Sequence, residues 1–358
     1  MARIELDLAH AYKPDPKADA DYALLPLQLT FEDGGAYALL GPSGCGKTTM
    51  LNIVSGLLAP SQGGVRFDGR DVTHASPQER NIAQVFQFPV IYDTMTVAEN
   101  LAFPLRNRKV PTAQIAKRVG EIAEMLELSG QLNQRAAGLA ADAKQKISLG
   151  RGLVRPDVSA VLFDEPLTVI DPHLKWQLRR KLKQIHRELK LTLIYVTHDQ
   201  IEALTFAEQV VVMTRGRVVQ MAGPQALFER PQHTFVGYFI GSPGMNFLPV
   251  HAAGGALRVA GSDATLAMPR ALPEGELLLG VRPEYVHTAA AGAPGSLQAA
   301  VAQVQDVGTS LMLTARLGGH TLKARLPADA EVPRAGDSVW LQLVGEHTCF
   351  YQNEELVA

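Results

Sequence analysis

A chain of 358 residues is long enough for two domains and a large buried core. Its 34 basic and 36 acidic residues leave a formal net charge of −2, so the overall charge does not indicate a nucleic-acid partner. The two cysteines, Cys45 and Cys349, do not suggest a disulfide framework, which favours a reducing compartment. We expect no export signal, and no apolar run reaches the roughly 18 residues that span a bilayer. Any membrane role is therefore expected to depend on a partner.

The N-terminal part predicts two strands. Residues 2–8 alternate between apolar and polar side chains, and residues 22–31 carry a second strand signal. Tyr12 lies between the two strands. An aromatic residue that precedes a nucleotide site can stack on adenine, while a position in a surface loop is equally consistent with the sequence.

A phosphate-binding loop follows the next predicted strand, residues 37–40. The sequence fits the pattern G-x-x-x-x-G-K-[ST] and then opens a helix. Backbone N–H groups of such a loop surround a polyphosphate, the lysine reaches the β- and γ-phosphates, and the first hydroxyl is a Mg²⁺ ligand. A small filler is the simpler role for the cysteine, and a redox switch is the alternative. The nucleotide-binding residues expected here are Gly41, Pro42, Ser43, Gly44, Cys45, Gly46, Lys47, Thr48 and Thr49.

The middle of the chain changes from β to helical periodicity. Residues 63–72 predict a hairpin closed by Asp68-Gly69, and residues 82–87 predict another buried strand. From about 88 to 152 apolar residues recur at helical spacing. This range is therefore expected to be an all-α insertion in an α/β core.

Two carboxylates end the next apolar strand, residues 160–165. Downstream of a phosphate loop, Asp164 is expected to hold Mg²⁺ through water and Glu165 to polarise the water that attacks the γ-phosphate. The strand at 192–197 leads to His198, at the sheet end where open α/β folds bind ligands. A solvated turn for the carboxylates and a structural histidine are the simpler alternatives.

The order of these motifs resembles the ATP-binding subunits of ABC transporters over essentially the whole chain. The matching segments are residues 41–49 for Walker A, Gln87 for the Q-loop, residues 161–165 for Walker B with its glutamate, residues 168–171 for the D-loop that ends at Asp171, and His198 for the switch histidine.

The resemblance implies a head-to-tail dimer in which each ATP lies between the Walker A of one chain and the signature motif of the other. It implies that Glu165 is the general base and that Gln87 and His198 sense the γ-phosphate, with Lys47 in the same catalytic set.

The cofactors implied by the resemblance are ATP and Mg²⁺. The implied Mg²⁺ ligands are Thr48, Gln87 and Asp164, and Tyr12 occupies the place of the adenine-stacking aromatic. The implied partners are a second ATP-binding subunit, two transmembrane permease subunits and a periplasmic or lipid-anchored substrate-binding protein, without nucleic acid. The implied location is the cytoplasmic face of the bacterial inner membrane.

The signature motif departs from the pattern. Where the family has Leu-Ser-Gly-Gly-Gln, this chain has Leu139, Ala140, Ala141, Asp142 and Ala143. In the family this stretch caps a helix whose N–H groups and serine bind the partner's γ-phosphate. Asp142 suits a helix N-cap, where its carboxylate would accept those N–H groups and would also repel phosphate by roughly 1–4 kcal/mol at about 4 Å.

The signature motif is altered, but the residues that this chain would contribute to its own ATP site, including Glu165 and His198, are intact. This difference predicts a heterodimer with one active and one weakened ATP site. The alternatives are that Asp142 is tolerated, that the chain is a regulatory subunit with little hydrolysis, or that it is a soluble ABC ATPase without a transport role.

A β-rich region of short strands follows residue 235. The predicted strands are residues 276–282, 297–305, 311–317, 321–326 and 338–343. Residues 280–284 (Gly-Val-Arg-Pro-Glu) resemble the C-terminal barrel of the sugar-importer branch, where it adds dimer contacts and sometimes regulation. The expected fold is an α/β phosphate-loop ATPase core at 1–235 with an all-α helical insertion at about 88–152, followed by an OB-like β-barrel domain at 236–358.

The cargo can be argued only from likeness. Residues 164–176 and the altered signature resemble one of the two ATP-binding subunits of bacterial glycerol importers, so glycerol is the favoured cargo. Other sugars or polyols stay open.

Overall fold

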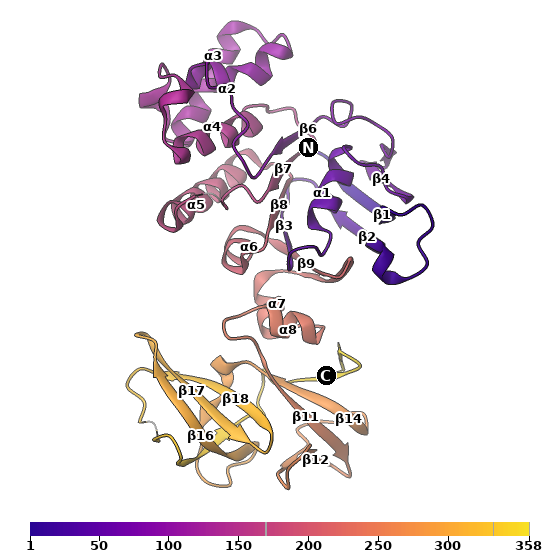
Figure 1. The fold of residues 1–358 in the computed structure, drawn as a ribbon, viewed down its shortest axis with the longest axis vertical. Helices are drawn as coiled ribbons and strands as arrows, with labels where there is room; N and C mark the ends of the chain where they lie inside the picture. The colour runs from indigo at the N-terminus through magenta and orange to yellow at the C-terminus, as the bar shows by residue number, and fades with distance from the viewer. Residues whose placement is uncertain (169, 332, 358) are drawn as a thin grey trace. The chain divides into compact units, whose positions relative to one another are not determined.

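The computed structural model describes residues 1–168, 170–331 and 333–357. These residues form two compact units, Met1–Pro224 and Gln225–Ala358, which are described separately (Figure 1). A boundary of independently folding domains after residue 235 stays a prediction. Val169, within the expected D-loop, lies outside the described residues.

The first unit contains two sheets with different strand directions. The smaller sheet is antiparallel, in the order β2 (Tyr22–Phe31), β1 (Ile4–Ala11), β4 (Gln62–Phe67) and β5 (Arg70–Asp71). The larger sheet has parallel central strands, in the order β10 (Arg217–Ala222), β9 (Gln209–Thr214), β3 (Ala36–Leu40), β8 (Leu193–Thr197), β7 (Ala160–Asp164) and β6 (Ile82–Val85). Parallel pairing of buried strands requires the apolar runs that the sequence contains at β3, β7 and β8.

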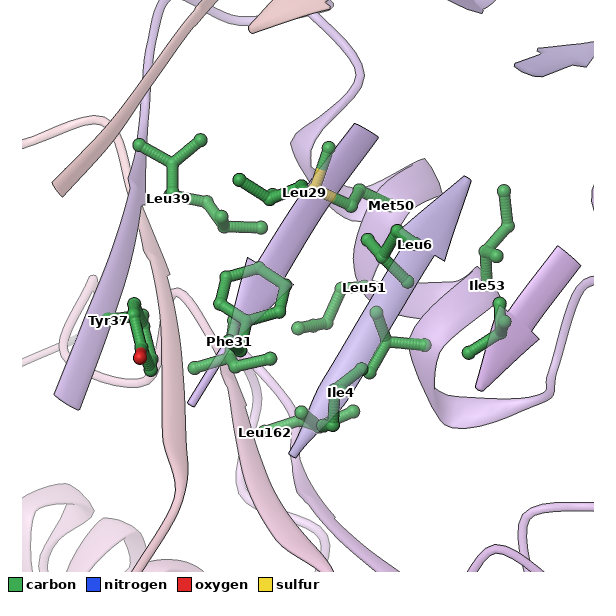
Figure 2. Packing of buried hydrophobic residues seen from close by; sticks show 14 of the residues in the cluster. Ile4, Leu6, Leu29, Phe31, Tyr37, Leu39, Met50, Leu51, Ile53 and Leu162 are labelled. Carbon is green, nitrogen blue, oxygen red and sulfur yellow. The ribbon is translucent and has the colours of Figure 1, made fainter. Parts of the chain in front are cut away.

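Helix α1 (Lys47–Ser55) lies in the core shared by the two sheets. Its side chains Met50, Leu51 and Ile53 meet residues of β1 and β2, such as Phe31, and of β3 and β7 in one buried cluster (Figure 2). A helix that is apolar on several sides must be buried on several sides, and here residues of both sheets pack against it. The start of α1, directly after the phosphate loop, is therefore held firmly.

The helical insertion contains three α-helices and two short 3₁₀ helices. The α-helices are α2 (Val97–Asn107), α3 (Thr112–Met125) and α4 (Ala141–Leu153), which pack together on one side of the unit (Figure 1). Thr96 begins α2 with a capping box, since its hydroxyl accepts from Glu99 N and the Glu99 carboxylate accepts from Thr96 N. Residues 88–96 contain no helix, so the helical range begins later than the sequence predicts. Two further helices, α5 (Pro172–Leu189) and α6 (Gln200–Phe206), belong to the α/β core.

The second unit consists of two antiparallel sheets around one core. Their strand orders confirm the five predicted strands and add strands that the sequence did not predict. One sheet runs β13 (Thr265–Ala267), β12 (Ala256–Val259), β11 (Asn246–Ala253), β14 (Gly275–Val281), β20 (Cys349–Gln352) and β21 (Glu355–Leu356); the other runs β15 (His287–Thr288), β19 (Ser338–Gln342), β16 (Ser296–Asp306), β17 (Ser310–Leu317) and β18 (His320–Pro327).

Arg282 fastens two short helices to the second unit's sheets. These helices are α7 (Pro224–Glu229) and α8 (Thr234–Phe239). The guanidinium is fully buried and lies 4.1 Å over the ring of Phe228. It donates to the backbone carbonyls of Leu227, Phe228, Gly237 and Ile240. Buried carbonyls at helix ends need such donors, which explains an arginine in an apolar core.

Candidate functional site

The phosphate loop joins the end of β3 to the start of α1. Gly44 and Gly46 have φ angles of 79° and 103°, which favour glycine. A Cβ at Gly46 would lie 2.5 Å from Ala23 O, and one at Gly41 would lie 2.3 Å from Met213 O. Close approach of neighbouring backbone therefore requires glycine at positions 41 and 46, whereas at Gly44 only the positive φ favours it.

The ammonium of Lys47 lies inside this loop. Lys47 is only 6% exposed, and its Nζ donates to Gly41 O at 2.8 Å and to Pro42 O at 3.0 Å. The loop thus presents a positive charge where polyphosphate would bind. Burial raises the pKa of the neighbouring Cys45 thiol, which keeps it protonated and favours the role of a small filler over that of a redox switch.

Thr48 on α1 and Asp164 on β7 bring two oxygen atoms that can bind a metal ion close together. The Thr48 hydroxyl donates to Asp164 Oδ1 at 3.4 Å. Burial, and then the negative charge of Glu165, raises the pKa of Asp164. A bound cation would relieve this unfavourable burial of charge. A hydroxyl and a carboxylate are hard oxygen ligands, so the pair fits a Mg²⁺ ion that is also bound by phosphates and water.

Glu165 and His198 meet at the ends of the adjacent strands β7 and β8. Glu165 Oε2 lies 3.1 Å from His198 Nδ1 and accepts from the Thr168 hydroxyl at 3.2 Å. Glu165 has a left-handed backbone conformation with φ of 47°, and its N–H donates to Val196 O at 3.0 Å. The strained backbone turns the carboxylate toward the strand end where the phosphate loop also lies.

Comparison with known proteins identifies both units. The ABC transporter family matches residues 24–168, the MalK OB fold domain matches residues 241–286 and the TOBE domain matches residues 279–350. The sn-glycerol-3-phosphate import ATP-binding protein UgpC of Cereibacter sphaeroides is 43% identical over 302 residues, covering 84% of this chain and 85% of that protein. The chain belongs to the ATP-binding subunits of ABC transporters.

Other members of the family match over most of their length. The protein of the same name from Chromohalobacter salexigens is 40% identical over 352 residues, covering 97% of this chain and 93% of that protein. Among solved structures, cbiO1 from Clostridium perfringens, part of the ABC transporter complex cbiONQ, has a TM-score of 0.58 and 25% identity, and covers 64% of this chain and 90% of that chain. This likeness confirms the expected ATPase fold, and the matches to the MalK OB fold and TOBE domains confirm the OB-like second domain.

Membership of this family means that the chain binds ATP and is an ATPase coupled to transport. The match to import subunits does not favour a regulatory subunit with little hydrolysis or a soluble ABC ATPase without a transport role. Within residues 1–168, 170–331 and 333–357, none of the helices is long and apolar enough to cross a bilayer.

Tyr12 and Gln87 are two further residues of the predicted nucleotide site. Tyr12 is 68% exposed, its hydroxyl lies 3.2 Å from the Thr49 hydroxyl, and its ring contacts the edge of His10 at 4.7 Å. The exposed ring is available for stacking on a base. Gln87 follows β6 and is half-buried. The roles of both residues stay predictions for this ABC subunit.

The signature helix α4 corrects the expectation for Asp142. The N-cap of α4 is Ala140, without a side-chain hydrogen bond, and Asp142 is the second helical residue. The prediction that Asp142 caps the helix is therefore wrong, because the chain enters the helix two residues earlier. Its charge still lies in the first turn, where the helix dipole favours a carboxylate.

Two further polar residues of this ABC subunit were missed by sequence reasoning. Glu202 on α6 is buried and accepts hydroxyl hydrogen bonds from β8. Gln145 on α4 is buried and donates to Pro166 O, just after Glu165. Glu202 stands between the apolar residues Ile201 and Ala203, which is a weak local signal, whereas Gln145 lies between two lysines and gave none. Asp171, expected in the D-loop, caps α5 by accepting from His173 N at 2.9 Å.

Proposed function

We propose that the chain is the ATP-hydrolysing subunit of an ABC importer that takes up a small polyol or its phosphate, with glycerol favoured. The observation that carries this proposal is the match over 97% of the chain to an sn-glycerol-3-phosphate import ATP-binding protein. The resemblance of residues 164–176 to glycerol importers favours the unphosphorylated polyol within the same chemical class.

The geometry supports a division of roles at the ATP site. Lys47 exchanges its loop carbonyls for the β- and γ-phosphates, and the Tyr12 ring stacks on adenine. Thr48 and Asp164 would hold Mg²⁺, and Gln87 would be its third ligand from this chain. When bound, the ion neutralises charge on the transferred phosphoryl group.

Glu165 acts as general base on the attacking water. Its Oε2 already accepts a hydrogen bond from Thr168 and lies near His198 Nδ1, so the carboxylate is oriented before substrate binds. His198 senses the γ-phosphate with its other ring nitrogen. Gln87 takes part in the same sensing.

The altered signature supports a heterodimer with a second ATP-binding chain. Leu139 to Ala143 lack the serine, glycines and glutamine of the family motif, and Asp142 adds a negative charge near the start of α4. A carboxylate about 4 Å from a phosphate costs roughly 1–4 kcal/mol in a partly wet site. The partner's signature would complete this chain's site, while the other site would be weakened.

The assembly also contains two permease subunits and a periplasmic or lipid-anchored substrate-binding protein. The chain itself would attach to the cytoplasmic face of the bacterial inner membrane through the permease. The second unit, with its MalK OB fold and TOBE matches, would add contacts between ATP-binding subunits.

Uptake by a deletion strain tests the cargo. Loss of the gene should abolish uptake of labelled glycerol at low concentration, and wild-type protein should restore it, whereas the Glu165→Gln variant should not. Unimpaired glycerol uptake together with lost glycerol-3-phosphate uptake would reassign the cargo to the phosphate. If uptake of both compounds were unaffected, the proposal would be wrong.

A further inference from the structure

Glu202 is a buried carboxylate close to the switch histidine but outside the ATP site. It is 2% exposed, on the first turn of α6. Its Oε2 accepts from the Tyr195 hydroxyl at 3.0 Å and from the Thr197 hydroxyl at 2.9 Å. Both donors lie on β8, the strand that leads to His198. A buried charge needs such partners, because desolvation costs several kcal/mol per ion.

These bonds fix the turn that carries His198. The Thr197 hydroxyl, which donates to Glu202, also accepts from Asp199 N at 3.0 Å. The Asp199 carboxylate in turn caps α6 by accepting from Ile201 N at 2.8 Å and Glu202 N at 3.2 Å. The residues on both sides of His198 are therefore held, while the His198 side chain itself is 53% exposed.

A second contact joins this turn to the segment that follows Glu165. Lys175 lies on the first turns of α5, and its Nζ is 3.5 Å from Glu202 Oε1. Among the described residues that oxygen has no hydrogen-bond partner, so the lysine is the charge that compensates it. The two segments that carry Glu165 and His198 thus meet twice, once through Glu165 and His198 and once through Lys175 and the buried Glu202.

Of the two contacts, the one between Lys175 and Glu202 is the stronger. The Glu165–His198 contact contributes little by itself, because the His198 side chain is 53% exposed and water screens the interaction. The Lys175–Glu202 pair is held by a carboxylate that is fixed through two hydroxyls and almost fully excluded from water. Charges in such surroundings interact more strongly.

We infer that Glu202 and Lys175 are positioning residues that set the distance between Glu165 and His198 during ATP hydrolysis. This inference rests on the proposed roles of those two residues. Neither Glu202 nor Lys175 touches the nucleotide in this account. They act by locking the turn after β8 against the start of α5, so their loss should slow catalysis without weakening ATP binding.

The experiment uses the importer complex purified through a tag on this chain. The variants are Lys175→Gln, Glu202→Gln, the double variant and the charge-preserving Lys175→Arg. Lys183→Gln is the matched control, because Lys183 also lies on α5 and bonds to α6, through Thr205 O at 2.8 Å, but far along the helix from His198. ATPase kcat, KM for ATP and the melting temperature are measured for each.

We expect Lys175→Gln and Glu202→Gln each to lower kcat about tenfold with KM for ATP within about twofold, because small misplacements of catalytic groups are costly. In the double variant kcat should also fall about tenfold, not a hundredfold, because both changes remove the same contact between Lys175 and Glu202. Lys175→Arg and Lys183→Gln should stay within about twofold of wild type.

The inference is overturned if Lys175→Gln keeps its kcat, if the two losses multiply, or if KM rises together with the fall in kcat. A lower melting temperature with unchanged kcat in the folded complex would likewise assign the pair a structural role only. Glu165→Gln is measured in parallel and reports on the proposed function separately, because turnover in that variant would exclude Glu165 as the base whatever the Lys175 variants do.

Discussion

His198 Nδ1 lies 3.1 Å from Glu165 Oε2, although 33 residues separate them in the chain. The two residues end neighbouring parallel strands, β7 and β8, so their meeting follows from the strand order of the larger sheet. Thr48, near the start of α1, and Asp164, at the end of β7, meet across 116 residues. The proposed ATP site thus lies at the carboxyl ends of the central strands of this sheet, around the start of α1.

Replacing the proposed general base should stop turnover. We expect Glu165→Gln to lower ATPase activity at least about 100-fold, because an amide cannot accept the proton of the attacking water. ATP binding should persist, since Lys47 and the loop backbone are unchanged. Steady-state hydrolysis and nucleotide binding by the assembled complex measure the two effects. Glu188→Gln, a change to an exposed residue near the end of α5, is the control and should hydrolyse normally.

Removing the buried ammonium should weaken nucleotide binding. We expect Lys47→Met to bind ATP roughly 10- to 100-fold more weakly, because a charge-assisted hydrogen bond contributes about 1.5–3 kcal/mol. The change also removes the donor from Gly41 O and Pro42 O. Equilibrium binding of a labelled ATP analogue measures the effect, and affinity equal to wild type would contradict the role of Lys47.

Restoring the family signature should raise turnover at the weakened site. The variant Ala140→Ser, Ala141→Gly, Asp142→Gly and Ala143→Gln removes one negative charge and adds donors for phosphate at the start of α4. We expect at least about a tenfold gain at that site, given a repulsion of roughly 1–4 kcal/mol. Glu127→Gln is the matched control, because it removes a carboxylate that pairs with Lys146 of the same helix at 3.5 Å. Equal ATPase rates in the wild-type complex, the restored-signature variant and the Glu127→Gln control would show that Asp142 is tolerated.

The burial of His10 predicts a pH-dependent stability. Burial lowers the pKa of His10 from its ordinary value of 6.5, and among the described residues neither ring nitrogen has a hydrogen-bond partner. The unfolded state then binds more protons below pH 6.5, so stability is lost as pH falls, by at most about 1.4 kcal/mol per pH unit. Urea unfolding at pH 8 and pH 5.5 gives the free energy of unfolding at each pH. The difference between the two values should be smaller in His10→Phe than in wild type. The exposed His74→Gln should keep the wild-type difference.

Loss of the buried guanidinium should destabilise the second unit. We expect Arg282→Met to lower its free energy of unfolding by about 3 kcal/mol, because four buried carbonyls lose their donor. Denaturant unfolding of the full chain measures this, and the exposed Arg258→Met should be neutral. An unchanged transition in Arg282→Met would mean that water satisfies these carbonyls.

Local sequence signals predicted the parts of the fold that depend on backbone chemistry. The hairpin at Asp68-Gly69 is confirmed, with φ angles of 51° and 78° at these residues, because few other dipeptides accept that turn. Strands β3, β7 and β8 were visible as apolar runs, since buried parallel strands leave no polar face. The glycine-rich loop between β3 and α1 was visible because its backbone conformation needs glycines at fixed positions.

Features that depend on packing could not be read in this way. The capping role of Asp142 was predicted wrongly, because the entry of the chain into α4 is set by surrounding structure and not by the aspartate. The contact between Lys175 and Glu202 needs α5, α6 and β8 in place, and no spacing rule marks it. Strands β11, β12 and β13 were missed because β12 and β13 are short, glycines stand in the turns between the three strands, and β11 contains Pro249.

The subunit composition of the importer distinguishes a heterodimer of ATP-binding chains from a homodimer. The complex purified through a tag on this chain would be analysed by native mass spectrometry. We predict one copy of this chain, one copy of a different ATP-binding chain with an intact signature motif, and two permease subunits. A complex with two copies of this chain and no second ATP-binding chain would contradict the account of the altered signature at Leu139 to Ala143.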